Sequence, residues 1–178
     1  MIILAIDPGT TESAFCLYNG DPGVANAERI LEAGKISNEK LLERLYCDSE
    51  EDGFDADAVV VEMVACYGMP VGREIFETVF WIGRFVEAVD SLGGPITWHR
   101  IYRKDVKLHL CQNPRAKDAN ISRALMDRFG DFSQGKTGKG TKKRPGPLYG
   151  FKGDMFAALA VAVTYSETIL TTHPERTN

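Results

Sequence analysis

The order of apolar segments along the sequence predicts an α/β protein with a mixed five-stranded sheet flanked by helices. Residues 2–6 and 58–61 are continuously apolar and rich in aliphatic residues, which is typical of strands buried on both faces. Three strand-like segments lead the chain with no helix between them, so the first three strands are predicted to be antiparallel. Helical patterns then alternate with two further strands.

The strands are predicted from their apolar patterns and the turn residues between them. Pro8 and Gly9 turn the chain directly after the first strand, so the first two strands form a hairpin. The third strand is weakly patterned and is placed at an edge of the sheet. A run rich in Val near residue 60 predicts a second buried strand, and another follows Pro95. The predicted strands cover residues 2–7, 13–18, 28–36, 56–64 and 96–102.

The helices are predicted from their apolar stripes and end signals. Ser37 can cap the first helix, and Gly130 can end the fourth. The second helix is apolar over more than half its circumference, so it is either central to the core or shared with a second subunit. The last helix is apolar with small residues. The predicted helices cover residues 38–47, 73–92, 104–110, 118–129 and 154–170.

The chain is predicted to form a single domain over residues 1–170, with a polar tail at 171–178. A loop rich in Gly and Lys covers residues 135–153. No apolar run reaches the roughly 20 residues of a membrane span, and the first apolar run lacks the basic flank of a signal peptide. The four cysteines form no C-x-x-C pair, which favours reduced thiols and a cytoplasmic protein.

Charge is distributed unevenly along the chain. The net charge is −4, yet residues 100–152 contain 14 Lys and Arg against four Asp. The rest of the chain is acidic. This asymmetry predicts a basic face on an acidic body, and an anionic polymer is the natural partner of such a face.

Three acids stand at the ends of predicted elements. Asp7 ends the first strand, Glu62 lies near the end of the fourth, and Asp154 begins the last helix. Each has an ordinary explanation: Asp7 as a turn former, Glu62 as a surface acid, and Asp154 as a helix cap. If the first and fourth strands run parallel, however, Asp7 and Glu62 lie side by side and repel each other unless a cation neutralises them.

A hard cation is the expected partner of such carboxylates. All-oxygen ligand sets favour Mg²⁺, with Mn²⁺ as a substitute, and substrate phosphate often completes the coordination. Ions held in this way can activate a water and stabilise the leaving oxygen in phosphodiester cleavage. The three acids together therefore favour a metal site in a nuclease.

The sequence resembles the RuvC-like Holliday-junction resolvases of the RNase H-like superfamily. The resemblance lies in motifs that occur in family order over nearly the whole chain: Ala5-Ile6-Asp7-Pro8-Gly9-Thr10, Val59-Val60-Val61-Glu62, Asp105-Val106-Lys107, Ala116-Lys117, and Asp154 ahead of Ala158-Leu159-Ala160-Val161-Ala162. The stretch from Lys142 to Gly150 is similar to the phage-encoded branch of the family.

This resemblance implies an RNase H-like fold and a homodimeric, Mg²⁺-dependent endonuclease that cuts branched DNA by paired symmetric nicks. It implies catalytic and metal-binding roles for Asp7, Glu62 and Asp154, and places Lys107 and Lys117 near the scissile phosphate. One position departs from the bacterial members, which carry a second acid one turn later in the last helix, where this chain has Ala157. Either Asp154 alone serves, or a fourth ligand comes from elsewhere.

Basic residues supply the predicted DNA contacts. Lys107 follows a strand whose end is expected near the acids, so it either contacts phosphate or stabilises transition-state charge, or is a solvated helix lysine. Lys117 can meet phosphate at a helix N-terminus or be a solvated loop residue. The glycine-rich loop can wrap a phosphate backbone, or merely aid solubility. The predicted DNA-binding residues among these are Arg115, Lys117, Lys136, Lys139, Lys142, Lys143, Arg144 and Lys152.

Tyr67 and Met69 follow Glu62 in a loop and either wedge between bases at a junction centre or pack at a dimer interface. Two other activities stay open: cleavage of an RNA–DNA hybrid or structured RNA, and junction binding without cleavage. The Asp7-Pro-Gly-Thr-Thr segment also resembles the first phosphate motif of actin-like ATPases and sugar kinases. Those folds need a second such domain, and this chain is too short to hold one.

Overall fold

The structure is a computed structural model that describes residues 1–47, 52–66, 68, 70–93, 95–130 and 137–172, of which 169–172 are described by their backbone alone. Five strands form one sheet in the order β3-β2-β1-β4-β5. They are β1 (Ile2–Asp7), β2 (Glu12–Asn19), β3 (Ile30–Ser37), β4 (Ala58–Met63) and β5 (Thr97–Tyr102). β2 pairs antiparallel with β1 and β3, whereas β4 runs parallel to β1 and β5. This is the mixed sheet that the sequence predicts, with β3 at an edge.

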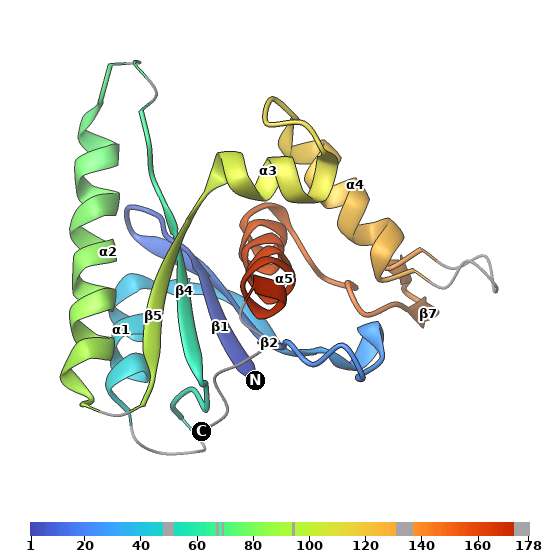
Figure 1. The fold of residues 1–178 in the computed structure, drawn as a ribbon, viewed down its shortest axis with the longest axis horizontal. Coiled ribbons are helices and arrows are strands. Elements are labelled where there is room, and N and C mark those ends of the chain that lie inside the picture. The colour runs from blue at the N-terminus through green and yellow to red at the C-terminus, as the bar shows by residue number, and fades with distance from the viewer. Residues whose placement is uncertain (48–51, 67, 69, 94, 131–136, 173–178) are drawn as a thin grey trace.

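Helices cover both faces of the sheet (Figure 1). On one face lie α1 (Asn38–Tyr46) and α2 (Arg73–Ser91). On the other, α5 (Gly153–Thr172) packs against β1 and β2, and α3 (Arg103–Cys111) and α4 (Asp118–Arg128) pack on α5. A short 3-10 helix, η1 (Asn26–Glu28), precedes β3. The observed helix and strand limits lie within two residues of those predicted. No helix in the described ranges is long and apolar enough to cross a membrane.

The continuous apolar run of β1 is explained by two cores on either side of the sheet. Ile3 and Ala5 point into the core with α5, whereas Leu4 and Ile6 point into the core with α1 and α2. All four side chains are completely buried. Because successive strand residues face opposite sides, a strand covered on both faces has no exposed position for a polar residue before its end. Asp7 is therefore the first place in β1 where a carboxylate can be held.

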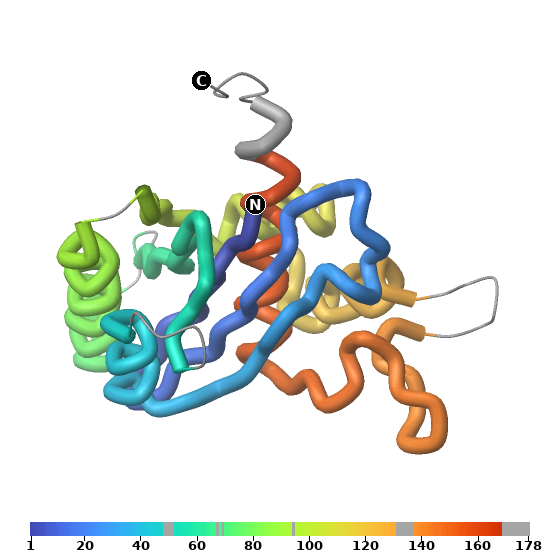
Figure 2. Tube along the Cα trace, turned by 90° about the horizontal axis from the view of Figure 1, so that it is seen from below, coloured from blue at the N-terminus to red at the C-terminus, as the bar shows by residue number. Residues whose placement is uncertain are grey.

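The segment predicted as a loop over 135–153 contains a small hairpin, so that prediction is wrong where β6 (Gly140–Thr141) pairs with β7 (Arg144–Pro145). Two glycines permit the close approach of its arms, since a Cβ on Gly146 would lie 2.3 Å from the carbonyl oxygen of Gly138. Leu148 anchors the base, completely buried, with its N–H donating to that same carbonyl at 2.8 Å. Figure 2 shows the hairpin projecting from the end of the molecule away from α1 and α2.

Candidate active site

The carboxyl ends of β1, β4 and β5 meet at one edge of the sheet because these three strands are parallel. Asp7 is the last residue of β1, and Glu62 is next to last in β4. Ile6 pairs with Val61 in the register, so the two acids that follow are neighbours. Their side chains hydrogen bond to each other. The structure therefore brings Asp7 and Glu62 together at this edge.

Burial disfavours the ionised forms of both carboxyls of this pair. Burial first, and the Glu62 carboxylate second, raise the pKa of Asp7 to about 8. Asp7 consequently keeps its proton near neutral pH and donates it to Glu62. Burial also raises the pKa of Glu62, against the opposing effect of Arg103. Since a nearby cation favours the ionised form of both carboxyls, binding a metal ion here would release the Asp7 proton.

Asp154 lies in the first turn of α5 and lines, together with Asp7 and Lys35, a hollow of about 340 Å³. Its carboxylate is bound by Lys35 of β3, whose Nζ lies 2.7 Å from Oδ2. Glu12 Oε2 also approaches the same ammonium, at 3.7 Å. Asp154 thus reaches the neighbourhood of Asp7, but its charge is neutralised by a lysine. Sequence reasoning missed Lys35, because nothing in the weak pattern of β3 marks it.

The donor set suits a hard divalent cation. Asp7 and Glu62 offer adjacent carboxylate oxygens, with Arg103 as the one cation bound to Glu62 among the described residues, and Asp154 offers a third carboxylate across the hollow. The described residues contain no ready-made cluster of three or more His, Cys, Asp or Glu ligands. Ala157, one turn after Asp154, is buried and supplies no fourth ligand. Two candidate ligands are therefore adjacent, and Asp154 would have to exchange Lys35 for the ion to act as a third.

A buried polar network holds the turn that carries Asp7. The Asn38 side chain donates to the carbonyl of Gly9 at 3.0 Å and accepts from the Ser13 hydroxyl at 2.6 Å. Ser13 Oγ in turn accepts from the Gly9 N–H at 3.2 Å. Ser13 and Asn38 are completely buried. Sequence reasoning treated Asn38 only as the start of a helix. A polar residue one position after the helix cap was the available signal for this network.

Arg103 is a second residue that sequence reasoning missed. It directly follows β5 and begins α3, so the parallel sheet delivers it to the edge where Glu62 lies. Its Nη1 lies 3.0 Å from Glu62 Oε2, and it lines a hollow of about 210 Å³ with Asp7 and Glu62. Its Nη2 lies 3.0 Å from Asp118 Oδ1, which Lys107 Nζ also approaches, at 3.5 Å. An arginine at the carboxyl end of the third parallel strand was the available signal.

These two cations govern the charge of Asp118. Burial opposes ionisation, but Arg103 and Lys107 outweigh it and hold the pKa of Asp118 below its ordinary value. Lys107 thus lies at the rim of the site, bound to Asp118.

The other predicted DNA-binding residues that the structure describes have exposed side chains before α4 and around the hairpin. Arg115 and Lys117 precede α4. The remaining basic side chains surround the hairpin and form no ion pair with a described carboxylate: Lys139, Lys142, Lys143, Arg144 and Lys152. Tyr67, Met69 and Lys136 lie outside the described residues.

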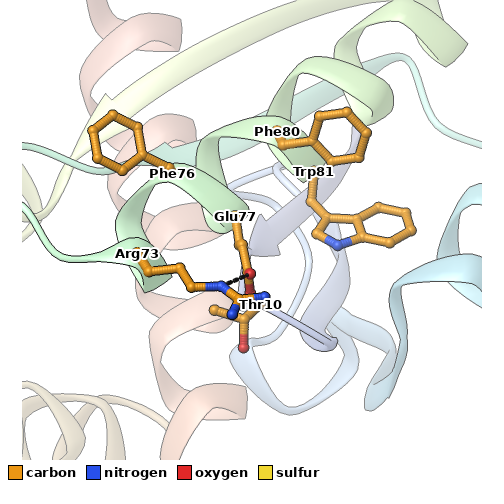
Figure 3. Close-up of a pocket in the computed structure, with 6 residues that line it drawn as sticks. All are labelled: Thr10, Arg73, Phe76, Glu77, Phe80 and Trp81. Carbon is orange, nitrogen blue, oxygen red and sulfur yellow. Dashed lines mark hydrogen bonds and ion pairs between the residues drawn. The ribbon is translucent and has the colours of Figure 1, made fainter.

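One face of α2 exposes large apolar side chains. Phe76 and Phe80, one turn apart, are 66% and 64% exposed. Beside them is a hollow of about 530 Å³, lined by Thr10, Arg73, Phe76, Glu77, Phe80 and Trp81. Figure 3 shows the two phenylalanine rings pointing away from the Arg73–Glu77 ion pair, which lies close to Thr10. A helix wholly inside the core would not expose these rings, so that prediction for α2 is excluded. The alternative, that α2 is shared with a second subunit, stays a prediction.

Comparison with solved structures identifies the fold. No protein-family model matches the sequence, and no curated protein matches it either. The RuvC structure from Thermus thermophilus superposes with a TM-score of 0.68, covering 97% of this chain and 97% of that one at 18% identity. The same organism's RuvC in complex with Holliday-junction substrate gives a TM-score of 0.66, covering 97% and 96%, also at 18% identity. The fold is RuvC-like.

The predicted fold class is therefore confirmed: a RuvC-like, RNase H-like arrangement with an antiparallel first half of the sheet. At 18% identity this likeness establishes the fold alone. The roles of residues in this protein are therefore inferred from the geometry of its own side chains. That geometry is the buried Glu62 carboxylate with the half-buried Asp7 beside it, a third carboxylate across a hollow, and Arg103 and Lys107 nearby.

Proposed function

We propose that the protein is a metal-dependent endonuclease that cuts four-way (Holliday) or other branched DNA by paired symmetric nicks. The observation that carries the proposal is the adjacent Asp7–Glu62 pair at the carboxyl edge of a RuvC-like sheet. The substrate class is supported by the likeness to a RuvC that was solved with a Holliday-junction substrate. We assign the activity to the cytoplasm of a bacterium or phage-infected cell.

Asp7, Glu62 and Asp154 are the proposed ligands of Mg²⁺, with Mn²⁺ as a substitute. The bound ion would supply an acidified water as nucleophile and positive charge beside the scissile phosphate. To hold it, Asp7 gives up the proton it shares with Glu62, and Asp154 releases Lys35. Lys107 lies beside the same edge, bound to Asp118, and its ammonium is suited to stabilise negative charge on the phosphate.

Contacts to the rest of the DNA are assigned to the basic half of the chain. Arg115 and Lys117 extend the cationic surface from α3 toward α4, and the hairpin carries Lys142 and Lys143 at its tip. Because the hairpin is closed by its own backbone pairing and anchored by Leu148, the backbone that carries these charges is formed before DNA binds. Preorganised charges lose less conformational entropy on binding than charges on a disordered loop. We assign Tyr67 and Met69, in the loop after Glu62, to the centre of the junction.

We assign the exposed face of α2 to a homodimer interface. Phe76 and Phe80 are the kind of aromatic anchors that interfaces bury, and a twofold axis across α2 would pair this face with itself. Paired symmetric nicks need two active sites related by symmetry, which a dimer provides.

The experiment that tests the function is incubation with three labelled substrates in Mg²⁺ or Mn²⁺: a four-way junction, a matched duplex and an RNA–DNA hybrid. We expect nicks at symmetric positions in the junction and little cutting of the duplex. Preferential cutting of the hybrid would replace the proposed substrate by RNA–DNA hybrid. Absence of cutting on all three, with either metal, would reject the nuclease.

One observation favours a second candidate, a junction-binding protein without cleavage activity. Lys35 forms an ion pair with Asp154, and Ala157 supplies no further carboxylate, so only Asp7 and Glu62 of the proposed ligands lie together without a lysine bound to them. Tight junction binding in EDTA, together with no cutting in Mg²⁺ or Mn²⁺, would favour this candidate.

A further inference from the structure

Arg103 and Lys107 lie four residues apart in α3, so their side chains share one face of that helix. Both reach the same oxygen of Asp118, the first residue of α4. Arg103 Nη2 lies 3.0 Å from Asp118 Oδ1, and Lys107 Nζ lies 3.5 Å from it. A single carboxylate oxygen is thus shared by two cations at the rim of the candidate active site.

Arg103 holds a second anion at the same time, because its Nη1 binds Glu62 Oε2 at 3.0 Å. The two contacts differ in their access to solvent. The Glu62 side chain is 10% exposed, whereas that of Asp118 is 69% exposed. Exposed ion pairs contribute little free energy. The contact with Glu62 therefore fixes the guanidinium, and the contact with Asp118 is the one that a competing anion can replace.

We propose that Arg103 is a phosphate-binding residue of the candidate active site. In this proposal Asp118 binds both Arg103 Nη2 and Lys107 Nζ until a DNA phosphate replaces its carboxylate. This inference rests on the proposed function, since it assumes that DNA reaches this edge of the sheet. A guanidinium presents parallel N–H donors that match the oxygens of carboxylate and phosphate alike.

The arrangement gives the phosphate a defined place. Because Nη1 stays on Glu62, a phosphate bound to Nη2 and Lys107 lies next to the Asp7–Glu62 pair. Asp118 then acts against binding, since DNA must displace it and its negative charge remains near the phosphate. Removing that charge should tighten DNA binding, and removing Arg103 should weaken it.

The test is binding of a labelled four-way junction in EDTA, where no metal contributes. Arg103→Gln is compared with Lys104→Gln, and Asp118→Asn with Asp105→Asn. Lys104 and Asp105 are exposed residues of α3, so each control makes the same change of charge nearby. We expect about tenfold weaker binding for Arg103→Gln and about twofold for Lys104→Gln. Asp118→Asn should bind about fivefold more tightly and Asp105→Asn about as tightly as the wild type. In the Arg103→Gln background, the gain from Asp118→Asn should fall to about twofold.

Several results would overturn the inference. Equal effects of Asp118→Asn and Asp105→Asn would show that Asp118 does not compete with DNA. Weaker binding by Asp118→Asn would show that Asp118 positions Arg103 instead. Arg103→Gln can unfold because it leaves Glu62 uncompensated, and a thermal melt detects this. The exposed Asp118→Asn variant then decides the matter alone. A folded wild type that binds neither junction nor duplex rejects the proposed function, and this inference with it.

Discussion

Asp7 has to meet two conflicting conditions in the metal-free protein. Its place at the end of a strand buried on both faces orients the carboxyl toward Glu62, yet the same burial and the same neighbour disfavour its ionised form. Asp7 is therefore protonated at neutral pH, because its pKa rises to about 8. A carboxyl in this state is ready to exchange its proton for a cation.

This proton predicts how metal-free stability depends on pH. The pKa of Asp7 in the folded protein, about 8, lies above its ordinary value of 3.8, so the folded state binds more protons between these limits. The stability from this group is fully present below the unfolded pKa and is lost as pH rises through about 8. Asp7→Asn should therefore raise the free energy of unfolding at pH 8 relative to wild type by about 2 kcal/mol, and by much less near pH 4.

Urea unfolding in EDTA at pH 4.5, 6 and 8 measures the effect. Asp105→Asn is the control, because it removes an exposed carboxylate. A constant difference between Asp7→Asn and wild type over this range would show that Asp7 does not hold the proton.

At the residue scale, the sequence predicted the acids better than the residues that neutralise them. Asp7 and Glu62 could be found because each breaks an apolar strand at its carboxyl end. Lys35 could not, because the acid that it meets depends on the register of β3, which no local pattern shows. Arg103 stands at the carboxyl end of a predicted strand, but the acid that it meets depends on the turn from β5 into α3.

At the scale of single elements, the turn between β1 and β2 depends on a side chain from α1. Asn38→Ala would leave the Gly9 carbonyl and the Ser13 hydroxyl without their buried partner, so the free energy of unfolding should fall by about 1–3 kcal/mol. Chemical unfolding measures this loss. Asn26→Ala is a matched control, because Asn26 makes one exposed hydrogen bond, and it should cost less than about 0.5 kcal/mol. Equal losses for the two variants would show that the network does not hold the turn.

The hairpin allows an electrostatic test. Changing Lys142, Lys143 and Arg144 to Ala should weaken DNA binding and reduce the slope of log K against log salt by about one for each phosphate that the hairpin no longer neutralises. The melting temperature should barely change, because all three side chains are exposed. Lys40→Ala, on the opposite face of the sheet, should leave the slope unchanged. An unchanged slope for the triple variant would remove the hairpin from the DNA interface.

At the scale of the whole molecule, the mixed sheet and its flanking helices follow from the sequence, because a strand that is buried on both faces leaves a continuous apolar run. The full strand order comes from the structure. The hairpin within residues 137–152 could not be predicted from the sequence. Its backbone pairing depends on the close contact of Gly138 with Gly146, and glycine-rich sequence alone predicts only a flexible loop. The exposure of Phe76 and Phe80 was equally hidden, since apolar periodicity does not distinguish a core from a surface shared between subunits.

The exposed face of α2 predicts the oligomeric state. A variant with Phe76→Ser and Phe80→Ser should dissociate at least about a hundredfold more readily than wild type, because burying each ring contributes about 1.5–3 kcal/mol. Sedimentation equilibrium measures the dimer dissociation constant. Leu108→Ser, which alters an exposed apolar residue of α3, is the control and should leave the dimer intact. A wild type that is monomeric at micromolar concentration would contradict the proposed interface.

The proposed nuclease depends above all on Asp7 and Glu62 as the metal-binding centre. A comparison of wild type and Asp7→Asn for both binding and Mg²⁺-dependent cutting of one labelled four-way junction measures this dependence. We expect Asp7→Asn to bind the junction as well as wild type in EDTA and to cut it about a hundredfold more slowly or worse. Cutting by Asp7→Asn at the wild-type rate would show that the metal-binding centre lies elsewhere.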